Sequence, residues 1–138
     1  MSADCPDLQR FLRGEIAAST FPHREHVRMA FEILRRHDFA ECVWQFSRAL
    51  RVMAAQAGRP EAFNQTVTLA FLSLIAERME GAPADFAAFE CANADLLEKG
   101  VLAHWYPPGR LTSASARRIF LLPEPAPHAA GSAARPCG

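Results

Sequence analysis

This sequence has no excess of charge of either sign. It contains 15 Lys and Arg residues and 15 Asp and Glu residues, so its formal net charge is zero with neutral histidine. Proteins that bind nucleic acids or anionic membrane surfaces usually carry a basic excess. We therefore expect neither kind of partner.

Long apolar runs are also missing. No stretch approaches the roughly 18 apolar residues of a membrane-spanning helix. The longest, "VTLAFLSLIA", is interrupted by a serine and ends at a charged pair. The start, "MSADCPDLQR", lacks the basic and apolar segments of a signal peptide. We expect a cytoplasmic protein without a membrane span.

The cysteines are not paired along the chain. They stand at Cys5, Cys42, Cys91 and Cys137, with no CxxC spacing. A four-cysteine zinc site normally needs such pairs. The pattern predicts free thiols, with Cys42 and Cys91 serving as small core residues of helices.

Familiar catalytic signatures are absent as well. The chain has no Gly-rich phosphate loop, no GxSxG elbow, no HExxH pair and no CxxCH haem motif. Half of its residues are apolar and 22% are charged, which is typical of a domain with one real core. The sequence thus indicates a globular protein but names no substrate.

What the sequence does contain is helical periodicity bounded by proline and glycine. It predicts an all-α, single-domain bundle of about five to seven helices within residues 1–122. Residues 123–138, rich in Pro, Ala and Gly, are expected to form a disordered tail. The expected helices are 4–14, 22–36, 39–57, 60–80, 83–92 and 95–104, with a last turn after Ser113. A strand at 64–72 is the alternative, but no second β-branched run could pair with it.

The helix at 22–36 carries two histidines on its apolar side. At about 100° per residue, His23 lies in line with Val27 and Leu34, and His26 falls about 60° away, next to Ile33. The charged residues of this helix occupy the opposite half. Both imidazoles are therefore predicted to point toward the core or a cavity.

The helix at 60–80 places polar residues inside its apolar stripe in the same way. Asn64 and Thr68 lie near its beginning and Arg78 near its end. Because buried polar groups need partners, His23, His26, Asn64 and Thr68 are predicted to meet in a polar pocket between the second and fourth helices. The histidines are candidate acid/base groups, and Asn64, Thr68 and Arg78 are candidate ligand-binding residues.

Two other interpretations remain open for these residues. The four side chains could form a hydrogen-bonded core network with no functional role. Alternatively, His23 and His26 could share a divalent transition metal such as zinc or iron, as two histidines three residues apart can. Such a site needs a third protein ligand, and no residue is clearly placed to supply it.

Three segments resemble a family of small, all-helical bacterial proteins of unknown function: "FPHREHVRMAFEIL", "FNQTVTLAFLSLIAERM" and "FECANADLLEKGVLAHWYPPGRLTSASARRIFLLPE". The resemblance covers most of residues 20–124. In that family the residue matching Asn64 is histidine, within a Tyr-His-Glu-Thr-like run, which implies a site of three imidazoles. This chain has Asn64 and Gln65 there, and an asparagine amide is a poor ligand for a transition metal.

The predicted function is that of a small enzyme or ligand-binding protein that uses this pocket on a small molecule. The alternative is a helical interaction module, either a homodimer or an accessory subunit. Trp44 or the loop around Tyr106 would then supply the contacts, because Trp, Tyr and Arg anchor many interfaces. Trp44 could equally pack against the tail or another helix.

Overall fold

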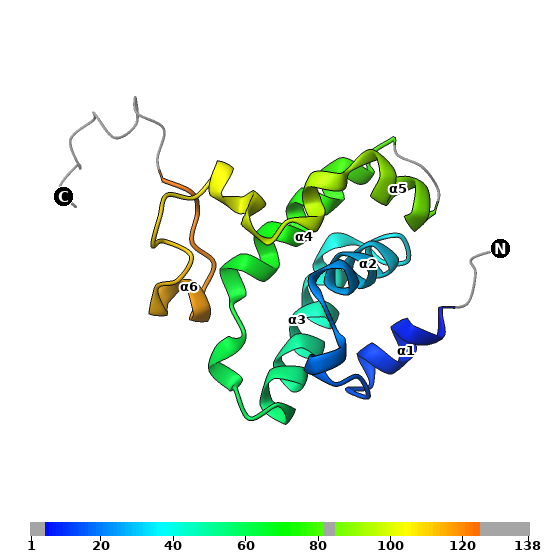
Figure 1. The fold of residues 1–138 in the computed structure, drawn as a ribbon, viewed down its shortest axis with the longest axis horizontal. Coiled ribbons are helices and arrows are strands. Elements are labelled where there is room, and N and C mark those ends of the chain that lie inside the picture. The colour runs from blue at the N-terminus through cyan, green and yellow to red at the C-terminus, as the bar shows by residue number, and fades with distance from the viewer. Residues whose placement is uncertain (1–4, 82–84, 125–138) are drawn as a thin grey trace, which may run out of the picture.

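The structure is a computed structural model that describes residues 5–81 and 85–124. Within these residues the chain is helical and contains no strand, so the predicted all-α fold is confirmed (Figure 1). The α-helices are α1 (Pro6–Leu12), α2 (His23–Leu34), α3 (Phe39–Gln56), α4 (Gln65–Met79), α5 (Phe86–Ala92) and α6 (Ala114–Arg118). Short 3₁₀ segments join them: η1 (Ala18–Thr20), η2 (Pro60–Ala62), η3 (Ala94–Leu97) and η4 (Lys99–His104).

Local signals in the sequence set most helix ends. The side chains of Asp38 and Ser113 accept hydrogen bonds from backbone N–H groups in the first turns of α3 and α6. Gly58 follows α3 with a φ of +74°, the left-handed conformation that closes helices at little steric cost for glycine. The bounds therefore agree closely with those predicted for 22–36 and 39–57.

The predicted helix 60–80 is divided in two. A 3₁₀ segment at Pro60–Ala62 is followed by extended residues Phe63 and Asn64, and α4 begins only at Gln65. The Asn64 side chain accepts a hydrogen bond from the N–H of Val67 and so caps α4. The region 64–72 that could have been a strand lies in this helix.

Aromatic rings hold the helices around one core. Phe11 of α1 stacks on Phe21 with ring centroids 5.0 Å apart and also contacts Phe46 of α3. Phe31 of α2 contacts Phe89 of α5 at 5.0 Å. All five rings are buried, so the same side chains that fill the core also fix α1, α3 and α5 around α2.

Helix α4 forms the wall between this core and the C-terminal segment. It contacts α2 and α3 on one side and α6 on the other (Figure 1). The hydroxyl of Thr66, which is fully buried, donates to the carbonyl of Ile119 at 2.7 Å and accepts from the N–H of Leu121 at 3.0 Å. One side chain thus ties the C-terminal segment to the start of α4.

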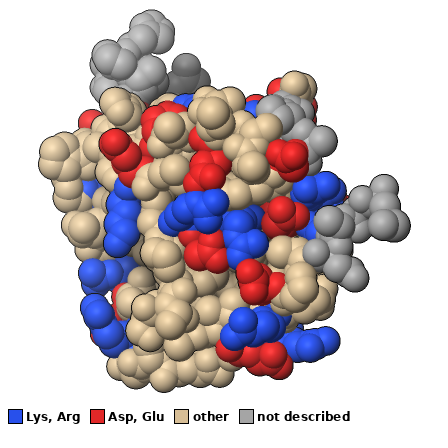
Figure 2. Space-filling view, turned by 45° about the vertical axis from the view of Figure 1, so that its right-hand side comes forward, with Lys and Arg blue, Asp and Glu red and all other residues tan. Residues whose placement is uncertain are grey.

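Charged side chains pair across the helices at the surface. Arg28 of α2 bonds Asp7 of α1 at 2.7 Å, and Arg24 of α2 bonds Glu90 of α5. Figure 2 shows acidic and basic groups side by side on one face, without a large field of a single sign. The Arg24 pair is exposed and contributes little to stability, whereas the Arg28 pair is partly buried; both balance the charge locally.

Cys42 is buried as predicted, but Cys91 is exposed, because it lies on the outer side of the short helix α5. None of the helices within 5–81 and 85–124 has the length and apolar character needed to cross a membrane. Pro123 and Glu124 are described, and the rest of the predicted tail lies outside the described residues.

Replacing Thr66 by valine should destabilise the fold by about 1–3 kcal/mol, because the Ile119 carbonyl and the Leu121 N–H both lose the bond to the buried Thr66 hydroxyl. Thr68→Val is the matched control, since that hydroxyl bonds only the Asn64 carbonyl one turn earlier in its own chain segment. The free energy of unfolding from urea titration checks this. Equal losses in the two variants would show that Thr66 does not hold the C-terminal segment.

Candidate functional site

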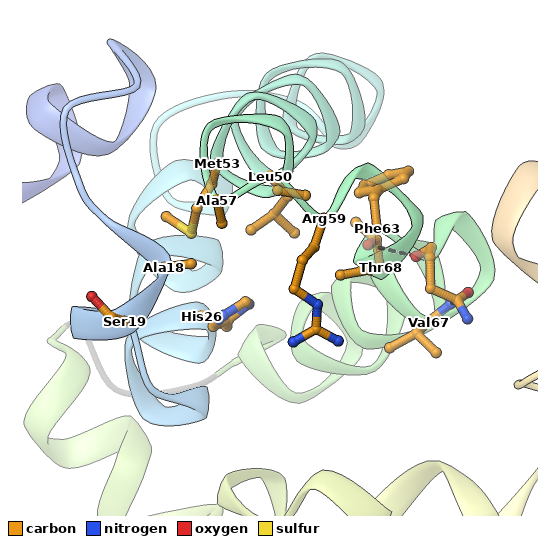
Figure 3. A pocket seen from close by; sticks show the side chains of 13 residues that line it. Ala18, Ser19, His26, Leu50, Met53, Ala57, Arg59, Phe63, Val67 and Thr68 are labelled. Atoms are coloured by element: carbon orange, nitrogen blue, oxygen red, sulfur yellow. Dashed lines mark hydrogen bonds between the residues drawn. The ribbon is translucent and has the colours of Figure 1, made fainter.

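An open pocket lies between α2, α3 and the start of α4, with a volume of about 440 Å³. We call it the His26 pocket (Figure 3). Its walls are largely apolar, and its lining residues are Ala18, Ser19, His26, Leu50, Met53, Ala54, Ala57, Arg59, Ala62, Phe63, Asn64, Val67 and Thr68. This size and this apolar lining are typical of pockets that bind small molecules.

Three of the four side chains predicted to meet do line this pocket: His26, Asn64 and Thr68. Asn64 is held on two sides, because its Oδ1 accepts from the Val67 N–H and its Nδ2 donates to the Leu111 carbonyl at 2.7 Å. Thr68 donates to the Asn64 carbonyl at 2.8 Å. Both residues therefore stabilise the N-terminal end of α4, and they border the pocket from this position.

His23 lies beside the pocket and does not line it. Its Nε2 is 3.0 Å from the carbonyl oxygen of Leu96, and because a carbonyl only accepts, Nε2 carries the hydrogen. Its ring also meets the Phe71 ring of α4 edge-on at 5.0 Å. His23 thus joins α2 to α4 and η3, which is a structural role.

His26 sits against Phe21, with ring centroids 4.6 Å apart. Burial lowers the pKa of its imidazole to about 4, and the nearby His23 adds to this effect, while a hydrogen bond to the Phe21 backbone acts in the opposite direction. The ring is therefore neutral at pH 7. A neutral imidazole with one N–H held by a carbonyl offers its other nitrogen as an acceptor.

A metal site built on the two histidines would need a third protein ligand. No group of three or more His, Cys, Asp or Glu side chains comes together anywhere in residues 5–81 and 85–124. The ring centroids of His23 and His26 are 6.3 Å apart, and the Nε2 of His23 faces a carbonyl. This geometry gives the pair separate hydrogen-bonding roles.

Arg78 does not reach the His26 pocket. Its guanidinium bonds both carboxylate oxygens of Asp95, at 3.0 and 2.9 Å, and the side-chain oxygen of Asn93 at 3.0 Å. These contacts fasten the far end of α4 to η3. The structure thus places Arg78 in a bidentate pair with Asp95, outside the pocket in which its ligand-binding role was predicted.

Sequence reasoning missed Arg59, the one charged residue among the described residues that line this pocket. It lies in the turn between α3 and η2, and Figure 3 shows its side chain extending toward the space between His26 and Val67. Its Nε is 3.9 Å from Glu61, and both side chains are largely exposed, so this pair is weak. The segment "GRP" places this arginine in a turn directly before a helix start, where helical periodicity does not indicate the direction of its side chain.

The residues predicted to contact a partner differ in exposure. Trp44 is 60% exposed on α3. Tyr106 is buried, and its hydroxyl donates to the Leu121 carbonyl at 2.8 Å. In that loop it is the neighbouring Trp105, 47% exposed, that offers a free surface.

No protein-family model, curated protein or solved structure matches this chain. The resemblance to small helical bacterial proteins therefore rests on the sequence motifs alone. Any assignment of function has to come from the site itself.

The stability of the protein should fall as the pH drops from about 6.5 to about 4, because the unfolded state gains a proton on His26 that the fold resists. The contribution of this residue is fully present above pH 6.5 and is lost through pH 4, with a limit of about 3 kcal/mol. Urea unfolding of the parent and of His26→Phe across this pH range separates the contribution of His26 from that of the carboxylates. Parallel pH curves for the two proteins would contradict the depressed pKa.

Proposed function

We propose that this protein binds a small molecule with an apolar body and a carboxylate at one end, in the His26 pocket. The observation that carries the proposal is the lining: apolar side chains surround a space of about 440 Å³, and its one charged group among the described residues is the Arg59 guanidinium. An apolar surface with one cation at the opening matches an apolar acid in both shape and charge.

Each end of the ligand has a counterpart in the pocket. The apolar body would lie against Leu50, Met53 and Val67. The carboxylate would meet Arg59, whose terminal nitrogens make no hydrogen bond to any of the residues in 5–81 and 85–124. A guanidinium in this state can bind a carboxylate in bidentate fashion.

Binding is favoured over catalysis by the state of the polar groups. His26 is neutral at pH 7 and, with its pKa near 4, is a weak base. Asn64 and Thr68 already bond the backbone that they hold in place. These groups suit the orientation of a ligand, with the free nitrogen of His26 accepting a hydrogen bond from a hydroxyl or amide.

Octanoate should bind saturably, and 1-octanol should bind more weakly because it lacks the charge. Arg59→Gln should weaken octanoate binding about tenfold and leave octanol unchanged. Arg48→Gln, an exposed arginine of α3 outside this pocket, is the control. Isothermal titration calorimetry measures both ligands on the parent and on the two variants, and equal binding of acid and alcohol would refute the anionic ligand.

Filling the pocket gives an independent test. Ala54 lines the space and Ala55, the next residue of α3, is exposed and does not. Ala54→Phe should abolish octanoate binding because the ring takes up the volume, whereas Ala55→Phe should leave it intact. If both variants bind octanoate as the parent does, the ligand lies elsewhere.

A further inference from the structure

A second cavity lies on another face of α4, away from the His26 pocket. Its volume is about 250 Å³, and it is lined by Ala70, Ser73, Leu74, Glu77, Leu102, Trp105, Tyr106, Phe120 and Pro123. We call it the Trp105 pocket. Residues from α4, from the end of η4 and from the C-terminal segment form it, and Figure 1 shows these segments beside one another.

Three aromatic side chains form much of its wall. Trp105 and Phe120 are 47% and 38% exposed, and Tyr106 is buried with its hydroxyl bonded to Leu121. No ring contact joins any two of these three within the described part of the chain, so the rings stand apart around the space. Exposed aromatic rings around a hollow carry an unfavourable contact with water that a ligand would relieve.

One carboxylate completes the lining, and no Lys or Arg among the described residues contributes to it. The Glu77 carboxylate makes no hydrogen bond or ion pair within 5–81 and 85–124. The neighbouring Arg78, which interacts electrostatically with Glu77, bonds Asp95, and Arg110, whose charge acts on the Tyr106 hydroxyl, donates from Nε to the Leu122 carbonyl. The charge that faces this space directly is therefore negative.

We propose that the Trp105 pocket binds a small molecule carrying a quaternary ammonium group, held by the three aromatic rings and the Glu77 carboxylate. Aromatic rings attract such cations through their electron-rich faces. A primary ammonium needs three hydrogen-bond acceptors, and this lining offers few beyond Glu77 and Ser73. A quaternary ammonium needs none, and a headgroup of choline size fits the volume.

Choline and its uncharged isostere 3,3-dimethyl-1-butanol test the proposal in the full chain. The sequence has two tryptophans, so Trp44→Phe leaves Trp105 as the single fluorophore. Choline should change its emission saturably, and the alcohol should bind at least about tenfold more weakly. No saturable change at roughly tens of millimolar choline, or equal binding of the two compounds, overturns the proposal.

Charge and ring variants separate the two contributions. Glu77→Gln should weaken choline binding severalfold, whereas Glu41→Gln, on the exposed side of α3, should not change it. Trp105→Ala, followed by calorimetry, should weaken it about tenfold or more. Both sites are exposed, so the variants should fold, which circular dichroism verifies. Unchanged choline affinity in Glu77→Gln and Trp105→Ala would place the binding elsewhere and refute the assignment.

Discussion

The rest of the structure depends on the hydrogen bonds at the start of α4. Asn64 caps the helix and holds the Leu111 carbonyl, and two residues later the buried Thr66 hydroxyl bonds the backbone at both Ile119 and Leu121. Within three residues, α4 thereby gains its first turn and its attachment to the C-terminal segment. Each buried group finds a partner, which is why a polar cluster is tolerated at this depth. Among the described residues, no buried side-chain nitrogen or oxygen is left without one.

The same constraint explains why the inward-facing polar residues have different tasks. His23, Asn64 and Thr66 each bond a backbone carbonyl that lies 73, 47 or 53 residues away along the chain. These polar side chains connect distant segments of the chain by hydrogen bonds, and so they have a structural role. His26 differs, because its ring packs against the nearby Phe21 ring and keeps one side on the pocket. Rotational position on a helix indicates that a side chain points inward, but the partner it meets decides its role.

Sequence reasoning succeeded where the signal was local. The caps at Asp38 and Ser113 and the glycine after α3 act on residues within one turn, so the helix bounds could be read directly. It failed where distant contacts decide. Because Pro60 was taken as the start of one long helix, Asn64 was not recognised as the cap of α4. Arg78 was assigned to a ligand because its partner Asp95 lies on a separate segment. Arg59 was not predicted because it lies in a turn, where helical periodicity gives no information on the direction of a side chain.

Helix α4 is the common wall of two pockets of opposite character. Asn64, Val67 and Thr68 border the one with Arg59, whereas Ala70, Ser73, Leu74 and Glu77 border the other. At about 100° per residue these two sets point roughly 130° apart, so the helix is enclosed on most sides. The start of α4 is also tied to the C-terminal segment by its bonds to Leu111, Ile119 and Leu121, so both pockets are built against one anchored helix.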